Sequence, residues 1–167
     1  MITSLAVPEP ENGSLPGFAT IFIHPNGEKS LISDIRIPKD SILCGFGSRA
    51  ILESPNYLTL QVELRKHILL FPEVLQYINH SCEPNVFFDT TAMQLIALKE
   101  ILPGEELCFF YPSTEWDMDR SFLCNCRTGS CLGLIRGAQY LPIETLTRYR
   151  LTDFIKSQLK SVGVGQE

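Results

Sequence analysis

Short apolar runs, rich in β-branched residues and separated by turn residues, make up the chain between positions 18 and 97. They predict strands at residues 19–23, 31–34, 41–44, 57–62, 67–70, 86–89 and 94–98. The stretch 58–62 alternates apolar and polar residues, which is typical of a strand with one face in the core and one in water. Pro-Asn-Gly at 25–27 and Pro-Gly at 103–104 predict turns. We therefore predict a mostly β domain of several small sheets.

Helical spacing is clear only near the C-terminus. Pro142 stands at an expected first helical position, and Thr152 is suited to cap a second short helix. The apolar positions at helical spacing are Ile143, Leu146 and Tyr149 in the first helix and Phe154, Ile155 and Leu159 in the second. Residues 75–78 predict one further helical turn. The fold class is thus α+β with a predominance of strand, and residues 1–17, which show no periodicity, are expected to form a flexible arm.

Composition and charge narrow the function classes. With 167 residues, 44% of them hydrophobic, the chain is long enough to bury the core of one globular domain. A formal net charge of -5 disfavours direct nucleic-acid binding and favours a basic peptide partner. We find no apolar run of about 18 residues that would span a bilayer and no signal peptide. We therefore expect no membrane association and an intracellular location, cytoplasmic or nuclear.

Four of the six cysteines form a candidate metal site. A glycine-containing loop carries three of them in close succession, Cys124, Cys126 and Cys131. Short turns let three such thiolates converge at about 2.3 Å from a zinc ion. Cys82 is the best candidate for the fourth ligand, because it lies in a dense polar cluster. A disulfide or unconnected thiols are the alternative, less favoured without a secretory signal. Cys44 and Cys108 lie in apolar runs and are expected to behave as small buried hydrophobes.

The polar cluster reads Asn-His-Ser-Cys-Glu-Pro-Asn from Asn79 to Asn85 and follows an apolar run directly. An amide, an imidazole, a hydroxyl and a thiol in four consecutive positions are unusual for ordinary core. Taken alone, Asn79 and His80 would be interpreted as polar groups that satisfy a buried turn.

Two companion motifs change that interpretation. Residues 104–111 read Gly-Glu-Glu-Leu-Cys-Phe-Phe-Tyr, and the cysteine loop reads Cys-x-Cys-x4-Cys-x-Gly up to Gly133. With the Asn-His-Ser-Cys cluster, in this order and across roughly residues 27–137, they resemble the SET-domain protein lysine methyltransferases with their post-SET zinc loop. The resemblance implies several short β-sheets around a pseudoknot, in which the Asn-His-Ser segment is threaded by the segment ending at Tyr111. It also implies a division into an arm (1–17), a SET domain (18–120), a zinc-stapled post-SET loop (121–137) and C-terminal helices (138–167).

The resemblance further implies S-adenosylmethionine as methyl donor, Zn²⁺ in the cysteine loop, and a lysine-bearing protein or peptide as substrate, with a histone among the candidates. Asn79 and His80 match cofactor contacts, the latter largely through its backbone. Phe122 and Leu123 fall where the family folds apolar residues over the adenine or the lysine stem. The cofactor loop, normally Gly-x-Gly, aligns on Glu28, Lys29 and Ser30, so both glycines are replaced.

Tyr111 matches the family's catalytic tyrosine and a cofactor contact. Methyl transfer from a sulfonium needs a deprotonated amine held in line with the S–methyl bond. An apolar channel beside a cation lowers the pKa of lysine, which is about 10.4 in water, and Tyr111 would orient the amine. Phe109 falls where the family varies between Phe and Tyr, and Phe there predicts capacity beyond monomethylation. Tyr57 stands where relatives place an aromatic residue lining the lysine channel, although a core or edge-strand tyrosine is an equal alternative.

Two further departures from the family are Phe110, in place of an acidic residue, and Arg127, in place of a glycine in the zinc loop. Two hypotheses follow. The first is an active lysine methyltransferase. The second is a non-catalytic SET module that binds cofactor or peptide as a scaffold, which the lost glycines at Glu28 and Ser30 keep open.

Overall fold

The computed structural model describes residues 17–163, so the expected arm lies outside this range except for Gly17. The strands are β1 (Ala19–Ile23), β2 (Lys29–Ser33), β3 (Ile42–Gly45), β4 (Gly47–Leu52), β5 (Thr59–Glu63), β6 (Lys66–Phe71), β7 (Asn79–His80), β8 (Val86–Asp89), β9 (Gln94–Ala97), β10 (Cys108–Phe109), β11 (Phe122–Leu123) and β12 (Leu134–Ile135). Short 3-10 helices are η1 (Glu73–Tyr77), η2 (Tyr111–Ser113) and η3 (Ala138–Tyr140), and the α-helices are α1 (Ile143–Leu146) and α2 (Asp153–Ser161). The prediction of a mostly β domain of small sheets is confirmed.

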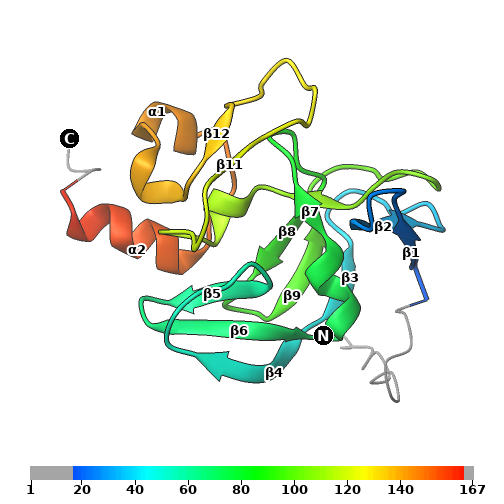
Figure 1. Cartoon of the computed structure of the whole chain (residues 1–167), viewed down its shortest axis with the longest axis horizontal. Coiled ribbons are helices and arrows are strands. Elements are labelled where there is room, and N and C mark those ends of the chain that lie inside the picture. The colour runs from blue at the N-terminus through cyan, green and yellow to red at the C-terminus, as the bar shows by residue number, and fades with distance from the viewer. Residues whose placement is uncertain (1–16, 164–167) are drawn as a thin grey trace, which may run out of the picture.

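The strands form small sheets rather than one large one. Strands β3, β9 and β8 make one three-stranded sheet and β4, β6 and β5 another, both antiparallel. The pairs β1–β2 and β11–β12 are antiparallel ribbons, whereas β7 and β10 pair in parallel. In Figure 1 the C-terminal helices lie on one side of the molecule and the β1–β2 ribbon on the opposite side.

Two hydrophobic clusters hold these parts together. The larger one fills the space between the sheets with fully buried side chains such as Leu31, Leu60, Phe88 and Leu95. The smaller one joins the helical extension to the domain, and its buried members are Phe110, Ala138, Leu146, Leu151, Ile155 and Leu159. Burying such apolar surface is worth about 25 cal/mol per Å². The C-terminal helices are therefore anchored to the domain rather than appended to it.

Local signals explain the helices. The Thr152 hydroxyl accepts a hydrogen bond from the Ile155 amide at 3.3 Å, which confirms its predicted capping role. Pro142 was expected inside the first helix, but it is the residue that precedes α1. Its extended ψ of 146° places it outside the helical region, so the helix begins one residue later.

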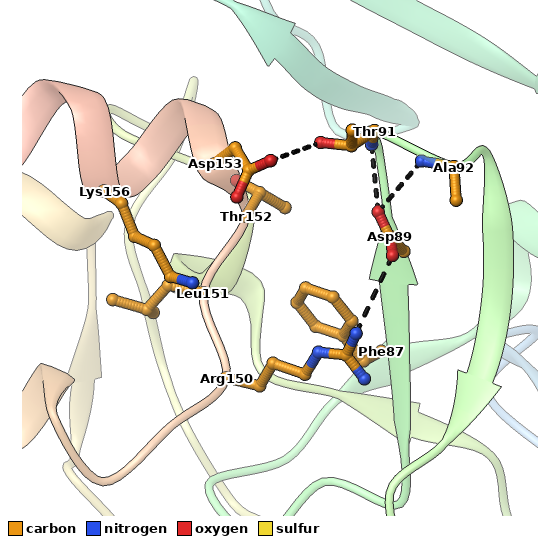
Figure 2. Close-up of a pocket in the computed structure, with 9 residues that line it drawn as sticks. All are labelled: Phe87, Asp89, Thr91, Ala92, Arg150, Leu151, Thr152, Asp153 and Lys156. Atoms are coloured by element: carbon orange, nitrogen blue, oxygen red, sulfur yellow. Dashed lines mark hydrogen bonds and ion pairs between the residues drawn. The ribbon is translucent and has the colours of Figure 1, made fainter. Parts of the chain in front are cut away.

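The seam between α2 and the β8–β9 turn contains a small pocket, shown in Figure 2. Two contacts cross it: Arg150 lies 3.7 Å from Asp89 and stacks over the Phe87 ring, while Thr91 donates a 2.8 Å hydrogen bond to Asp153. These contacts fasten the helix to the turn. We therefore interpret the pocket as part of the seam.

The structure differs from the sequence prediction at two places in the sheets. Strand β4 was not predicted, because its Gly-Ser-Arg-Ala sequence lies on an exposed edge and shows no apolar alternation. Gln61 was expected to face water within the alternating stretch 58–62, yet it is 3% exposed. Its backbone amide donates to Glu115 at 3.0 Å and its side-chain oxygen accepts from the Trp116 amide at 2.9 Å. These distant partners make its burial possible.

Candidate functional site

The two motifs that were predicted to meet do so in the parallel pair β7–β10. Asn79 lies beside Cys108, and His80 beside Phe109. The Ser81 amide then donates to the Phe109 carbonyl at 3.1 Å. Asn85 closes the junction with its side chain, because Nδ2 donates to the Glu106 carbonyl at 2.8 Å and Oδ1 accepts from the Cys108 amide at 2.9 Å. The polar cluster is thus bonded along its length to the segment that leads to Tyr111.

The Asn79 side chain faces the position where the family has its glycine loop. Its Nδ2 donates to the Lys29 carbonyl at 2.8 Å, and it lies 3.4 Å from Ser30 Oγ and 3.3 Å from Glu106 Oε1. Lys29 itself is exposed, with its ammonium 4.9 Å from the centre of the Tyr77 ring. Asn79, Lys29 and Ser30 are therefore neighbours, whereas the Glu28 side chain is exposed.

The His80 ring is held between the backbone of Tyr111 and the sulfur of Cys82. Its Nδ1 accepts from the Tyr111 amide at 3.1 Å, so the proton of the neutral ring is on Nε2, which lies 3.3 Å from Cys82 Sγ. Burial lowers the pKa of His80 to about 4, which keeps the ring neutral at physiological pH. The family resemblance gave His80 a mainly backbone role, but here its side chain also bridges the cysteine cluster and Tyr111.

Tyr111 lies in a small aromatic group. Its ring centre is 4.7 Å from that of Phe109, 5.2 Å from that of His80 and 5.8 Å from that of Phe122. Burial raises the pKa of the Tyr111 hydroxyl well above its ordinary value, and the neighbouring thiol of Cys108 and carboxylate of Glu115 add to that rise. The phenol therefore keeps its proton and is available as a hydrogen-bond donor.

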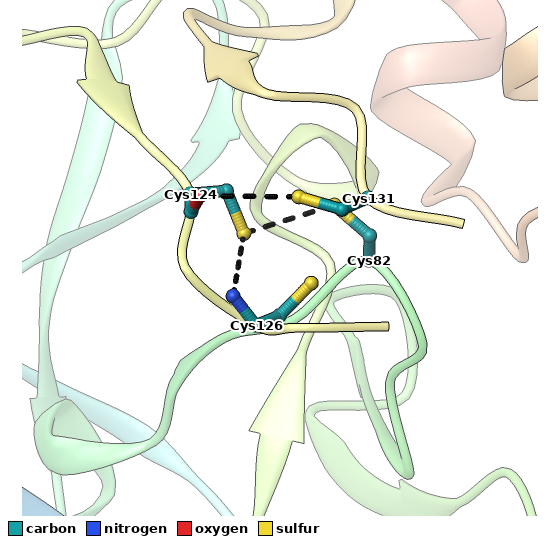
Figure 3. Close-up of side chains that lie close together, drawn as sticks. All are labelled: Cys82, Cys124, Cys126 and Cys131. Carbon is teal, nitrogen blue, oxygen red and sulfur yellow. Dashed lines mark hydrogen bonds between the residues drawn. The ribbon is translucent and has the colours of Figure 1, made fainter. Parts of the chain in front are cut away.

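Four cysteine sulfurs converge at the far end of the same junction (Figure 3). Those of Cys82, Cys124, Cys126 and Cys131 all lie within 4.8 Å of one another, and the Cys82 and Cys124 sulfurs are 3.9 Å apart. Ligands about 2.3 Å from a tetrahedral zinc ion lie about 3.8 Å from each other. The predicted four-ligand set is thus brought together with spacing that suits zinc, and all four residues are free of disulfides.

Backbone amides support this cysteine cluster. The Leu132 amide points at Cys82 Sγ from 3.3 Å, and the Cys126 amide at Cys124 Sγ from 3.4 Å. Such N–H to sulfur contacts favour the thiolate that metal binding requires. Arg127 adopts a φ of 57°, in the left-handed region that favours glycine, so the conformation at this position is one that glycine would adopt without strain.

Two of the predicted site residues, Tyr57 and Leu123, are exposed and lie apart from the group around Tyr111. The Tyr57 side chain is 84% exposed in the turn before β5, and Leu123 is 78% exposed on the outer face of the β11–β12 ribbon. Phe122, its neighbour, points inward and packs its ring against His80 at 5.6 Å. Cys108, expected to be a buried hydrophobe, is only half-buried, whereas Cys44 is buried as predicted.

Sequence reasoning missed several residues around the site. His24 Nε2 lies 2.6 Å from Ser30 Oγ, and Glu115 is buried next to Tyr111. The Tyr149 hydroxyl donates to the Cys82 carbonyl at 2.7 Å, and its ring stacks on Phe110 with ring centres 3.6 Å apart. The last contact explains the departure at Phe110, because an aromatic ring is what the C-terminal extension packs against. Only spatial proximity links these residues, so no local pattern could have found them.

Comparison with known proteins agrees with this geometry. A family model described as the SET domain matches residues 28–112, slightly more than half of the chain. The chain belongs to the SET domain family. Among solved structures, the crystal structure of KRYPTONITE in complex with mCHG DNA and SAH aligns with 70% of this chain and 29% of that chain, with a TM-score of 0.55 and 20% identity. At that identity the likeness shows the fold.

Sequence relatives carry methyltransferase names. Methyltransferase flvH of Aspergillus flavus is 44% identical over 87 residues, which are 51% of this SET chain and 49% of the relative. The Histone-lysine N-methyltransferase, H3 lysine-36 specific, of Chaetomium globosum is 31% identical over 90 residues, which are 47% of this chain and 10% of the relative. The chain thus spans about half the length of the first relative and a tenth of the second. Within residues 17–163, none of the helices is long and apolar enough to cross a membrane.

Proposed function

We propose that this SET chain is an S-adenosylmethionine-dependent methyltransferase that acts on the ε-amine of a lysine in a protein or peptide. The observation that carries the proposal is the junction of β7 and β10, which places the Asn79–His80 pair beside Tyr111 and joins both to the cysteine cluster. The names of the relatives support methyl transfer, and the Chaetomium relative is named for histone lysine.

S-adenosylmethionine would supply a methyl group on a positively charged sulfonium. In the transfer, the amine lone pair forms a bond to the methyl carbon while the carbon–sulfur electrons return to sulfur, and the amine then releases a proton to solvent. Asn79, with Ser30 packed behind it, would hold the methionine end of the donor, and Phe122 would pack against its other end. The SAH in the KRYPTONITE structure supports a donor of this class.

Tyr111 would position the attacking amine. Its hydroxyl keeps its proton because burial raises its pKa, so it can orient a lone pair by hydrogen bonding without becoming an anion that would hold a lysine ammonium. Phe109 is 7% exposed and packs its ring on Phe88 and Tyr111, next to the proposed position of the amine. Because it is a phenylalanine, it offers no hydroxyl to that amine. We infer from this that the site accepts an already methylated lysine.

The four clustered cysteines would hold one Zn²⁺. The ion would fix the loop 124–131, and with it the Phe122 ring that packs on His80 and Tyr111. The division into SET domain (18–120), post-SET loop (121–137) and helical extension (138–167) fits this arrangement, and we keep it as part of the proposal.

One observation favours a second candidate function. Ser30 fills a position where the family has glycine, and its hydroxyl is already bonded within the protein. If the Ser30 side chain narrows the donor site so that S-adenosylmethionine does not bind, the protein would be a scaffold that binds a peptide without methylating it.

Calorimetry separates the two functions. Purified, zinc-loaded protein is titrated with S-adenosylmethionine and S-adenosylhomocysteine, and labelled-methyl transfer is then measured on an array of lysine-bearing peptides that includes histone tails. We expect saturable binding of both compounds and label on lysine. Absence of donor binding together with peptide binding would establish the scaffold instead.

Mass spectrometry of the labelled peptides tests the role of Phe109. We expect di- or trimethyl-lysine at saturating donor. A purely monomethylated product would contradict the inference drawn from Phe109.

A further inference from the structure

His24, at the end of the β1–β2 ribbon, reaches the residues that surround Asn79. It directly follows β1, and its backbone amide donates to the Glu28 carbonyl at 2.8 Å, which fixes the turn. Its ring is half-buried, with the Phe22 ring packed edge-on at 4.9 Å. From there Nε2 lies 2.6 Å from Ser30 Oγ.

Ser30 connects His24 to Asn79. It is 2% exposed, and its hydroxyl lies between His24 Nε2 and Asn79 Nδ2, which is 3.4 Å away. A serine hydroxyl has one proton and two lone pairs. The arrangement that satisfies every atom is a chain in one direction: Asn79 Nδ2 donates to Ser30 Oγ, and Ser30 Oγ donates to His24 Nε2.

The contacts around Nδ2, with this chain as one of them, fix which way the Asn79 amide points. The neighbours of Nδ2 are the Lys29 carbonyl, the Ser30 hydroxyl and the Glu106 carboxylate, all of which can accept. A flipped amide would bring Oδ1 against the Lys29 carbonyl, which can only accept, so the flip is disfavoured. Among residues 17–163, the Asn79 side chain makes its hydrogen bonds through Nδ2, and Oδ1 has no hydrogen-bond donor, so it is left available to a ligand.

We propose that His24 and Ser30 are positioning residues for the methyl donor, because they hold the Asn79 amide with its oxygen toward the donor site. Ser30 stands at one of the two positions where the family has glycine, and His24 contacts it from the end of β1. A carbonyl oxygen fixed in this way suits a positively charged ligand with N–H donors, such as the amino-acid end of a sulfonium nucleoside. The inference rests on the proposed function.

The alternative is that the His24–Ser30 contact merely stabilises the ribbon. Two variants separate the roles. H24Q keeps a hydrogen-bond acceptor at the position of Nε2, whereas H24L is of similar size and offers none. Thr20 provides the matched control, since it lies on β1, the strand that His24 follows, and its hydroxyl bonds to Asp34 at 2.8 Å, away from Asn79. T20V therefore removes a comparable hydrogen bond without touching the chain of contacts.

The measurements are calorimetric affinity for S-adenosylhomocysteine, steady-state kinetics with a methylated peptide, and the melting temperature. We expect H24L and S30A to weaken binding about three- to tenfold, the effect of one hydrogen bond. The KM for the donor should rise by a similar factor at unchanged kcat, with the melting temperature close to wild type. H24Q and T20V should bind like wild type. Because His24 acts through Ser30, the H24L/S30A double variant should lose no more than S30A alone.

Each outcome has a definite meaning. If wild type binds S-adenosylhomocysteine and both H24L and S30A bind it equally well, the positioning role is wrong and the proposed function stands. If both variants and T20V lose affinity in proportion to a loss of melting temperature, the contact is structural only, which also overturns the proposal. If wild type itself binds neither donor nor product, the proposed function fails and this inference fails with it. S30A keeps the test decisive should H24L fold poorly.

Discussion

The hydroxyl group of Tyr111 makes no visible contribution to the stability of the fold. Among residues 17–163 that hydroxyl makes no hydrogen bond, while the ring packs against Phe109, His80 and Phe122. Tyr111→Phe should therefore leave folding and donor binding nearly unchanged. If the hydroxyl orients the amine, kcat should fall about 100-fold or more, as for other residues that act on a transition state. Initial rates of labelled-methyl transfer and calorimetry measure the two effects.

Tyr57→Phe is the matched control, because it removes the same hydroxyl from a side chain that is 84% exposed. Activity within about twofold of wild type is expected for it, given the small effects of surface substitutions. If the rate of methyl transfer fell equally in both variants, Tyr57 could not serve as a control, and its predicted position in the lysine channel would be supported. A fully active Tyr111→Phe would remove Tyr111 from the mechanism.

Glu115 is the buried acid of the site, and it makes stability depend on pH. Burial raises its pKa from 4.5 to about 7, although hydrogen bonds from Thr114 and the Gln61 amide lower it in part. Its protonated form is thus favoured by folding. The corresponding stability is complete below pH 4.5 and is lost as pH rises through 7, about 3 kcal/mol in all.

Urea unfolding at pH 5 and pH 8, with zinc present in excess, measures this effect. Glu115→Gln removes the titration and should abolish the corresponding drop, whereas Glu63→Gln, on an exposed side chain, should retain it. Zinc thiolates become more stable with rising pH, in the opposite direction, so the comparison of the variant with wild type isolates Glu115. Identical pH dependence in both proteins would contradict the assignment.

At the level of elements, the β11–β12 ribbon and the cysteine loop it carries have too few apolar residues to pack by themselves. Leu123 and Leu134 face outward, and only Phe122 and Ile135 face the molecule. Metal removal should therefore affect this ribbon first. Cys126→Ser should lower the zinc content well below one per chain and weaken donor binding, because Phe122 is no longer held against His80.

Elemental analysis and calorimetry test this prediction, and Cys44→Ala is the control because that thiol is buried outside the cluster. Cys44→Ala should keep its zinc even though it loses some stability through a small core cavity. A Cys126→Ser protein with full zinc content and full donor affinity would show that the loop does not depend on the metal.

The sequence predicted those elements whose signal is local. Strands β1 and β8 were predicted to the residue, and the cap at Thr152 was found because capping needs only its own helix. The two-residue strands β7 and β10 exist because Asn85 and the two backbones bond across the junction, which no single segment displays. Gln61 was misjudged for the same reason, since its partners Glu115 and Trp116 lie 54 and 55 positions away.

The candidate site, like the fold, was predicted only in part. The cysteine set and the meeting of the Asn79 and Tyr111 motifs followed from spacing and family resemblance. The His24–Ser30 contact and the His80–Cys82 contact did not, because they depend on side-chain directions that are fixed only by the packed fold.

For the whole molecule, the C-terminal extension is bonded to the site through Tyr149. Its ring stacks on Phe110, next to Tyr111, and its hydroxyl bonds to the carbonyl of the proposed zinc ligand Cys82. Tyr149→Phe keeps the stacking and removes only the hydrogen bond. We expect a loss of about 1 kcal/mol in the free energy of unfolding, because the Cys82 carbonyl loses a partner.

Zinc affinity, measured by competition with a chelator, should fall with it by several-fold. Tyr140→Phe is the control, since its hydroxyl bonds to the exposed Asp117. If Tyr149→Phe lowers stability while zinc affinity is unchanged, the extension supports the domain without reaching the metal site.

The contact between Tyr149 and Cys82 spans 67 positions of the chain. During synthesis Cys82 and His80 leave the ribosome well before Tyr149 and Tyr111, so at first they lack these hydrogen-bond partners. Of the four cysteines proposed to bind zinc, only Cys82 has emerged until the loop 124–131 follows. The proposed zinc site would be complete only after Cys131 has emerged, and a premature stop between positions 138 and 148 would release a protein that holds all four proposed ligands yet lacks the Tyr149 hydrogen bond to Cys82.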